Sequence, residues 1–390
     1  MSSRYGRDTI VEINLDAVKH NVSEFKKCVN DENIVMMAIL KANGYGHGSV
    51  EVSRAVLEAG VSQLAVAFVD EAIELREAGV TVPILVLGYT PVAAAKDAIQ
   101  YDIMMTVYRI EDLQGINEFA KQLGKKACIH IKIDTGMSRI GLREEEVVPF
   151  LEELKSMKYI EVAGIFTHYS TADEIDKTYT NMQTNLFEKI VKTVKEMGVN
   201  FPYIHSSNSA GSMKLSNTFQ NMVRVGIGIY GMYPSKEVDH TVVSLQPVLS
   251  LKSKVAHIKY AKKNRGVSYG NTYRTTGEEW IATVPIGYAD GYNRQLSNKG
   301  YALINGIRVP ILGRVCMDQL MLDVTKAMPV HVGDEVVFYG KQGEESIPVE
   351  EIADLLSTIN YEVTCMLDRR IPRVYTENGE MTTVVNILRK

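Results

Sequence analysis

The sequence lacks the long apolar runs that membrane proteins need. No stretch of about 18 consecutive apolar residues occurs in its 390 residues, which argues against a transmembrane helix. The first residues, MSSRYGRDTIVEINL, also lack the extended apolar region of a secretory signal peptide. We therefore expect a cytoplasmic protein without a membrane partner.

Clustered cysteines and clustered basic residues are missing as well. The four cysteines, Cys28, Cys128, Cys316 and Cys365, are far apart and form no Cys-x-x-Cys pair. This spacing argues against a disulfide framework and against a zinc site, so we expect no metal. The formal net charge is −4 and no block of basic residues occurs, which gives no electrostatic basis for binding nucleic acid.

What remains is the composition of an ordinary globular protein. Hydrophobic residues make up 45% of the chain and charged residues 23%. A chain of 390 residues is longer than one hydrophobic core usually supports. We therefore expect two domains, with a boundary near residue 240.

The first domain, residues 1–240, alternates short apolar runs with amphipathic stretches. Two of these stretches, 70–79 and 109–124, have helical periodicity, and a further helix over 16–30 is predicted to be capped by Asp16. A doubly wound open sheet would also alternate, but the number of strands favours a (β/α)8 barrel. The eight apolar runs span 35–40, 63–67, 84–88, 103–107, 128–134, 162–168, 203–206 and 222–226.

The pattern changes after a polar, turn-rich crossover that begins near residue 234. The remaining residues, 241–390, contain β-type runs such as VLSLKSKVAHIKY and WIATVPIG, separated by Gly and Pro. Only residues 349–357 have a helical pattern. The expected fold class is therefore α/β, an N-terminal (β/α)8 barrel followed by a mostly β C-terminal domain.

Charged side chains follow several of the predicted barrel strands. Active sites of such barrels lie at the carboxyl ends of the strands, where positive charges would here surround an anion. The residues at these ends are Lys41, Tyr45, Lys132, Arg139, His168, Ser209 and Arg224, with Gly226 and Ile227 just beyond. Loops after strands seven and eight frequently bind phosphate, and a strand-end lysine can form an imine. Together these features predict pyridoxal phosphate held by Lys41 as a Schiff base.

Nine motifs, in order along residues 12–373, resemble those of the bacterial alanine racemases. They are KANGYGHG, IKIDTGMSRIG, FTHYSTADE, NSAG, VRVGIGIYG, VSYGNTY, VPIGYADG, GRVCMDQ and INYEV. Gly44 and Gly211 stand where the family commonly has alanine, and neither change removes a functional group. The resemblance implies racemisation of alanine with pyridoxal 5'-phosphate, supplying D-alanine for the cell wall.

The resemblance also implies a role for each matching residue. Lys41 would carry the cofactor and act as one acid/base, and Tyr269 of the partner subunit would act as the other, in a homodimer with composite sites. Other cofactor contacts would come from Tyr45, Ser209, Gly226, Ile227 and Tyr361 at the phosphate, Arg224 at the pyridine nitrogen, and His168 beside the ring. Arg139 would bind the substrate carboxylate, and Met317 and Tyr288 of the partner subunit would line the substrate entrance. Lys132 matches a position that is carbamylated in some members, although it could instead pair with Asp134.

Arg224 discriminates best among the functional alternatives. Most pyridoxal enzymes have a carboxylate at the pyridine nitrogen, which keeps that nitrogen protonated. An arginine, whose pKa exceeds about 12, cannot accept that proton. This favours a racemase over a decarboxylase of the same fold. A non-catalytic pyridoxal phosphate carrier would be a barrel alone. Serine or another small amino acid remains open as the substrate, and so does a catabolic role.

Overall fold

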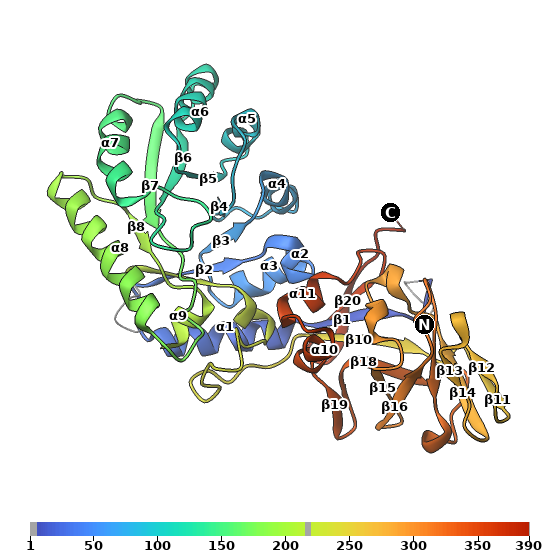
Figure 1. The fold of residues 1–390 in the computed structure, drawn as a ribbon. Coiled ribbons are helices and arrows are strands. Elements are labelled where there is room, and N and C mark those ends of the chain that lie inside the picture. Colours follow the sequence, from blue (N-terminus) through green and yellow to red (C-terminus); the bar gives the residue numbers. More distant parts are fainter. Residues whose placement is uncertain (1–5, 215–219, 390) are drawn as a thin grey trace. The chain divides into compact units, whose positions relative to one another are not determined.

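The computed structural model of the protein describes residues 6–214 and 220–389, which form two compact units (Figure 1). We call the first the barrel unit; it comprises the described residues of 18–44 and 49–246. We call the second the sheet unit; it comprises the described residues of 1–17, 45–48 and 247–390. The prediction assigned residues 1–240 to the barrel domain, whereas the described residues 6–17 are grouped with the C-terminal residues.

The barrel unit contains a closed barrel of parallel strands in sequential order, as the sequence predicts. The ring closes where Val35 of the first strand lies opposite Met222 of the last. Four of its strands are buried along their whole length, which explains their continuous apolar runs. The described strands are β2 (Val35–Ile39), β3 (Gln63–Val66), β4 (Ile84–Val86), β5 (Met104–Val107), β6 (Ala127–Lys132), β7 (Ile160–Phe166), β8 (Tyr203–His205) and β9 (Met222–Val225).

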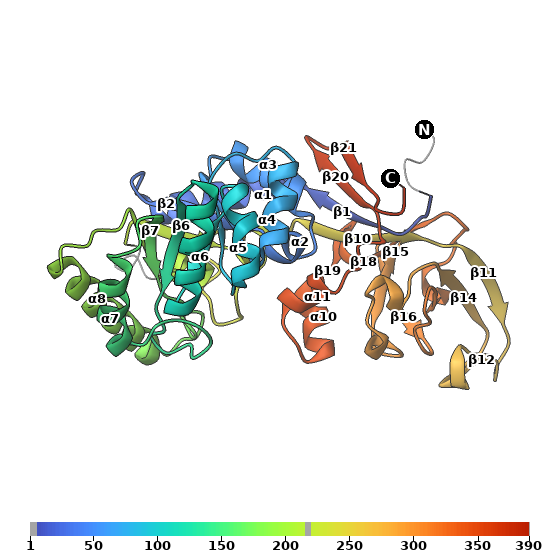
Figure 2. The same cartoon turned by 90° about the horizontal axis from the view of Figure 1, so that it is seen from above.

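Helices cover the outside of the barrel (Figures 1 and 2). Helix α6 (Ile110–Leu123) illustrates why: Leu113, Ile116 and Ala120 recur at helical spacing and are buried, and Gly124 ends the helix with a left-handed φ of 64°. The other helices are α1 (Leu15–Val29), α3 (Ser49–Glu58), α4 (Val69–Glu77), α5 (Val92–Gln100), α7 (Glu144–Leu154), α8 (Thr178–Glu196) and α9 (Ser209–Lys214), with the 3-10 turn η2 (Ile227–Tyr230).

The predicted cap of helix α1 is wrong in one detail. Asn14, rather than Asp16, precedes the helix, and its Oδ1 accepts a hydrogen bond from the backbone N–H of Ala17 at 3.1 Å. The carboxylate of Asp16 instead accepts a hydrogen bond from the backbone N–H of Asn378 at 2.6 Å. A sequence offers Asn and Asp as equal candidates for a cap, so spacing alone could not separate them.

The sheet unit is built on one large, mostly antiparallel sheet (Figure 2). Strand β1 (Ile10–Asn14) belongs to it because it pairs with β10 on one side and β20 on the other. The other strands are β10 (Leu249–Lys254), β11 (His257–Ala261), β14 (Glu279–Val284), β15 (Tyr301–Ile304), β16 (Ile307–Leu312), β17 (Leu320–Asp323), β18 (Glu335–Gln342), β19 (Glu345–Ile347), β20 (Arg373–Glu377) and β21 (Glu380–Val385), and a separate pair is formed by β12 (Gly266–Val267) and β13 (Tyr273–Arg274).

The sheet unit has more helix than the sequence predicts. Helix α10 (Val349–Leu356) agrees with the prediction, but α11 (Asn360–Cys365) was not expected. Six residues are too few to show helical periodicity, and three of the six are Asn, Val and Thr, which are weak helix formers. Short 3-10 turns complete the unit: η3 (Tyr269–Asn271), η4 (Tyr288–Asp290), η5 (Arg294–Leu296) and η6 (Thr325–Ala327).

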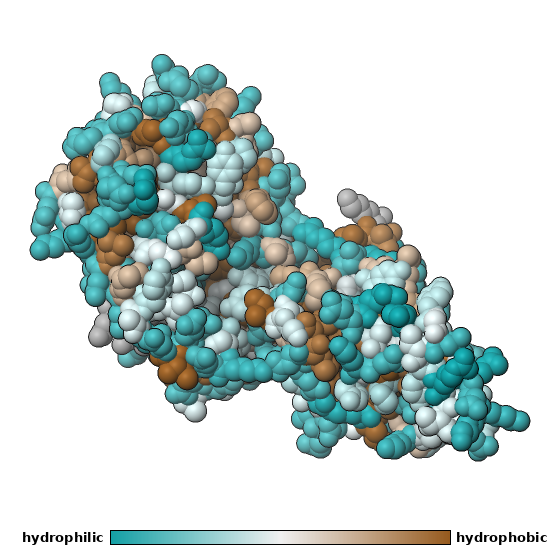
Figure 3. Space-filling model, in the orientation of Figure 1, coloured by the Kyte–Doolittle hydropathy of each residue, from teal (hydrophilic) through white to brown (hydrophobic). Residues whose placement is uncertain are grey.

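The surface shown in Figure 3 is largely hydrophilic, with apolar residues scattered over it. Across the part of the chain that the structure describes, no helix has both the length and the hydrophobicity of a membrane span.

Candidate active site

Arg224, on strand β9, is a buried cation held by several acceptors. Its Nη1 donates to Nδ1 of His205 at 2.8 Å, and its Nη2 lies 3.1 Å from Nδ1 of His168. Nη2 also donates to the backbone oxygens of Thr167 and Ser206, at 2.9 and 3.0 Å. None of these acceptors is a carboxylate. Burial lowers the pKa of Arg224 to about 10, so the guanidinium still carries its charge at neutral pH.

Two further histidines extend this hydrogen-bonded chain. Nε2 of His205 lies 2.9 Å from Nδ1 of His130, on strand β6. An arginine can only donate, so Nδ1 of His205 accepts, and a neutral His205 must then carry its proton on Nε2. His130 consequently accepts at Nδ1 and carries its own proton on Nε2, an atom with no partner among the described residues. The chain of donors therefore runs outward from Arg224.

The environment keeps these imidazoles neutral. Burial, reinforced by the charge of Arg224, lowers the pKa of His130 to about 3. The same two causes lower the pKa of His205 and of His168 well below its ordinary value. Nδ1 of His168 accepts a hydrogen bond from Arg224, so a neutral His168 carries its proton on Nε2 and can donate a hydrogen bond from that atom to another group.

The sequence analysis identified neither His130 nor His205 as a residue of the site. A signal for His130 was present in the sequence. His130 and Lys132 are two positions apart on strand β6, and residues at this spacing lie on the same face of a strand. Gly164, on β7, makes room for the ring: a Cβ there would lie 2.6 Å from His130 ring atoms.

Lys132 is a second buried cation in the barrel unit. Only 2% of the residue is exposed, and its Nζ donates to the backbone oxygen of Ile133 at 2.7 Å. In the described structure it forms no ion pair with Asp134, whose Oδ1 accepts from two backbone N–H groups instead. Burial, with the charge of Arg224 as the next cause, lowers the pKa of Lys132 to about 7. A neutral amine is therefore well populated at physiological pH.

An aromatic ring lies near both buried cations. Lys132 Nζ is 5.3 Å from the centroid of the Phe166 ring, and the guanidinium carbon of Arg224 is 5.4 Å from it. The same ring is stacked on His205, with centroids 4.7 Å apart. Cation–π attraction therefore helps to hold positive charge in this region.

The segment that begins at Lys41 is a left-handed turn. Ala42, Asn43 and Gly44, within the element labelled α2 (Lys41–Tyr45), have φ angles of 54°, 54° and 60°. Left-handed conformation costs L-residues about 1–2 kcal/mol each. Hydrogen bonds from Ala42 N to the Glu71 carboxylate (2.6 Å) and from Gly44 N to Leu40 O (2.8 Å) hold the turn. Backbone strain maintained by such contacts is typical of functional sites.

The remaining predicted residues fall into one group in each unit. In the barrel unit, buried Ser209 accepts a hydrogen bond from the backbone N–H of Gly226 at 2.9 Å, next to Ile227, and Arg139 lies exposed in the loop after β6. In the sheet unit, the Tyr45 and Tyr361 rings are 6.1 Å apart. The side chains expected to serve the partner subunit are exposed: 72% for Tyr269, 41% for Tyr288 and 53% for Met317.

Two of these exposed residues lie on adjoining loops of the sheet unit. The hydroxyl of Ser268, which precedes Tyr269, donates to the backbone oxygen of Arg314 at 2.6 Å. Arg314 is three residues before Met317. Among the described residues, no three His, Cys, Asp or Glu side chains are grouped as a metal would require.

Comparison with known families gives this arrangement its context. The family model described as "Alanine racemase, N-terminal domain" matches residues 13–234, and that described as "Alanine racemase, C-terminal domain" matches residues 248–375. The chain belongs to the alanine racemase family. The resemblance seen in the sequence motifs is thereby confirmed, as is the expected fold class.

Individual alanine racemases are similar over nearly the whole chain. An alanine racemase of Methanococcus maripaludis is 48% identical over 365 residues, covering 93% of this chain and 97% of that relative. The structure of an alanine racemase from Clostridium difficile 630 has a TM-score of 0.94 at 46% identity, covering 98% of this chain and 99% of that chain. An alanine racemase from Bacillus anthracis with bound L-Ala-P has a TM-score of 0.94 at 42% identity, covering 99% of both chains.

Proposed function

We propose that this protein is a pyridoxal-phosphate-dependent alanine racemase that interconverts L-alanine and D-alanine. The observation that carries the proposal is Arg224, a buried guanidinium whose acceptors are two neutral histidines and backbone oxygens. A carboxylate at this place would keep the pyridine nitrogen protonated. An arginine there favours rapid return of the proton to Cα over transamination or decarboxylation.

The residues of the chain fit the proposed cofactor. Lys41 offers an amine that would hold the cofactor covalently. The pyridine nitrogen of the cofactor would lie against Arg224, whose Nε–H has no acceptor among the described residues. The phosphate would be held by Tyr45, Ser209, Gly226, Ile227 and Tyr361, and His168 would lie beside the ring. When bound, pyridoxal phosphate supplies the electron sink that makes the Cα–H bond of the amino acid acidic.

Two bases on opposite faces of the substrate then complete the reaction. Lys41 would exchange the proton on one face, and Tyr269 of the partner subunit would exchange it on the other. Each base removes a proton in one direction of the reaction and returns one in the other direction. The Nε2–H of His168 is available to donate to the phenolic oxygen, which would stabilise the deprotonated form of that tyrosine.

Substrate recognition is assigned to three further residues. Arg139 would bind the carboxylate of alanine. Lys132, once carbamylated, would carry a negative charge and would orient Arg139. Tyr288 and Met317 of the partner subunit would line the entrance and limit the size of the amino-acid side chain. We propose a homodimer on this basis, with D-alanine serving the cell wall and the reaction taking place in the cytoplasm.

The competing functions have less support. A decarboxylase of the same fold would be expected to place an acidic group against the pyridine nitrogen, where Arg224 stands. A non-catalytic carrier would consist of a barrel alone, whereas residues 248–375 of this chain match the racemase C-terminal domain.

The proposal is tested by incubating the purified protein, with added pyridoxal phosphate, with a panel of L-amino acids. Loss of optical rotation should be fastest with L-alanine. The Lys41→Ala variant should be inactive, whereas Lys125→Ala, which removes a surface lysine, should retain full activity. Faster racemisation of serine would reassign the substrate, and release of carbon dioxide without racemisation would overturn the proposal.

A further inference from the structure

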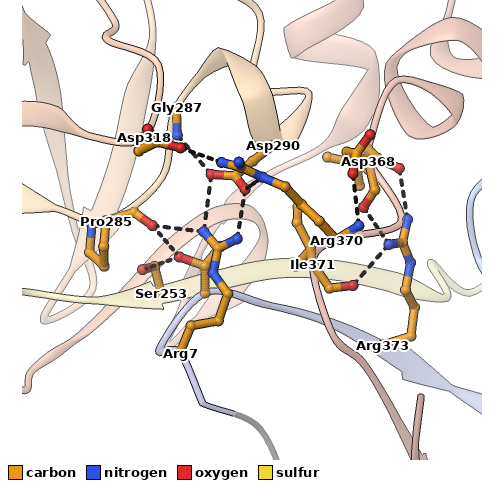
Figure 4. Close-up of polar contacts among 12 residues, drawn as sticks. Arg7, Ser253, Pro285, Gly287, Asp290, Asp318, Asp368, Arg370, Ile371 and Arg373 are labelled. Carbon is orange, nitrogen blue, oxygen red and sulfur yellow. Dashed lines mark hydrogen bonds and ion pairs between the residues drawn. The ribbon is translucent and has the colours of Figure 1, made fainter. Parts of the chain in front are cut away.

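Arg370 lies at the centre of a charged network in the sheet unit that the proposed chemistry does not use (Figure 4). Its Nε donates to Oδ1 of Asp290 at 2.7 Å, and its Nη2 donates to Oδ1 of Asp318 at 2.6 Å. Arg7 binds both oxygens of Asp290: its Nη1 donates to Oδ1 at 2.7 Å and its Nη2 donates to Oδ2 at 3.0 Å. One buried carboxylate thus joins three distant parts of the sequence.

Asp290 is an anion in a dry position. Its side chain is fully buried, and it also accepts a hydrogen bond from the backbone N–H of Gly287 at 3.0 Å. Burial alone would raise the pKa of Asp290, but hydrogen bonds from Arg7 and Arg370 outweigh burial and leave that pKa below its ordinary value. Two arginines on one carboxylate leave a surplus positive charge, and Asp318 balances it.

The network holds together two loops that touch through their backbones. The backbone N–H groups of Tyr288 and Ala289 each donate, at 3.0 Å, to the carbonyl oxygens of Cys316 and Met317 respectively. Gly287 permits this approach, since a Cβ there would lie 2.3 Å from both carbonyl oxygens. The Asp290–Arg370–Asp318 chain therefore bridges the same two loops a second time, through side chains.

These two loops carry the exposed side chains of Tyr288 and Met317. The Tyr288 and Met317 side chains extend into solvent in the described chain, so their positions are set mainly by the backbone beneath them. A buried ion pair is seldom the most stable solution, because apolar residues of similar volume are often as good or better. Directional hydrogen bonds between charged groups do, however, fix geometry.

We propose that Arg370 is a positioning residue for substrate binding, which sets the relative position of Tyr288 and Met317 by linking Asp290 to Asp318. The proposal rests on the proposed function, since it takes these two residues to line the entrance for alanine. Loss of the link should loosen both loops and weaken the binding of alanine more than it slows the chemical step.

The test compares Arg370→Gln and Asp318→Asn, alone and combined, in the holoenzyme. Asp318 is 59% exposed, so its variant should fold even if Arg370→Gln does not. Each single variant should raise KM for alanine about fivefold or more, with kcat within about twofold of wild type. The double variant should be no worse than the worse single variant, because both remove the same link. Arg370→Lys, which keeps the charge, should restore part of the loss.

A matched control separates positioning from stability. Arg308 forms a comparable ion pair with Glu351 at 2.7 Å in the same unit, so Arg308→Gln should leave KM unchanged. Hydrogen–deuterium exchange of the peptide containing Tyr288 and Ala289 should be faster in Arg370→Gln and unchanged in Arg308→Gln.

The outcomes distinguish this proposal from the proposed function. If the wild-type holoenzyme does not racemise alanine, the proposed function fails. If it does, and KM and amide exchange of the Asp318→Asn and Arg370→Gln variants match wild type, the role of Arg370 is refuted. Additive effects in the double variant would likewise show that the two residues do not act through one link.

Discussion

Arg224 donates to His205 over 2.8 Å, and this single contact fixes the protonation of two imidazoles. We predict that His205 and His130 are both neutral and both protonated on Nε2 throughout the pH range from about 5 to 9, given a His130 pKa of about 3. Long-range proton–nitrogen NMR on protein with ¹⁵N-labelled histidine distinguishes the two tautomers and the cation. An imidazolium signal from either residue at pH 6 would show that the chain of donors is wrong.

Lys132 should react with carbon dioxide. Its pKa of about 7 leaves roughly half of the amine neutral at pH 7. A neutral amine adds to carbon dioxide to form a carbamate and releases one proton. A ¹³C carbamate signal should appear with labelled bicarbonate at pH 8 and should disappear on acidification below about pH 6, where the amine is protonated.

The Lys132→Ala variant provides the control, because it removes the reacting amine and should remove the signal. Lys125→Ala, a change at an exposed lysine, should leave the signal intact. A carbamate that survives Lys132→Ala would place the modification on another lysine.

Lys41 should be the site of the cofactor. The protein as purified should be yellow, and borohydride should bleach the colour by reducing the imine to a stable secondary amine. Peptide mapping of the reduced protein should find the adduct within KANGYGHG. An adduct on any other lysine, such as Lys132, contradicts the assignment.

Tyr269 should act across a dimer interface. Lys41→Ala and Tyr269→Phe are each expected to be inactive, and mixing them with subunit exchange should form dimers that hold one site with both native bases. Random exchange makes half of the dimers mixed, so the recovered activity should approach about a quarter of wild type. Zero activity after demonstrated exchange would mean that Tyr269 serves its own chain.

Asp290 should govern stability in acid. Its folded pKa is depressed, so its contribution is present above the ordinary aspartate pKa of about 4 and is lost as the pH falls through the lower folded value. Asp290→Asn leaves two arginines without their carboxylate and should reduce the free energy of unfolding by about 3–5 kcal/mol at pH 7. Urea denaturation of this variant beside Asp97→Asn, at an exposed aspartate, measures the difference. Equal midpoints for the two variants would refute the prediction.

The barrel could be predicted from the sequence because its strands are buried on both faces, so each leaves a continuous apolar run. Strand β1 was missed because its partners are remote: Val11 pairs with Leu251 and Arg373, and nothing local marks such pairs. Lys41 and Arg224 stand at strand ends and were found by position. The role of His130 was not found, because it depends on a hydrogen bond to another strand.

The turn after Lys41 could not be predicted for a different reason. Ala42 has no local preference for a left-handed conformation. Its φ of 54° is imposed by tertiary contacts such as the hydrogen bond to Glu71, which is 29 residues further along the chain. Sequence motifs identified the residues of this turn without indicating its handedness.

Strand β1 also has a consequence for the order of events during synthesis. It is translated before every other strand that the structure describes, yet its parallel partner β20 begins only at Arg373, and the N–H that binds Asp16 belongs to Asn378, 362 residues away. All the strands of the barrel are translated before β20 exists. Until then β1 can pair only with β10, and its other edge stays open, which is a site for aggregation on the nascent chain. A chain truncated before β20 would thus leave one edge of β1, the first of the described strands to be made, without its partner.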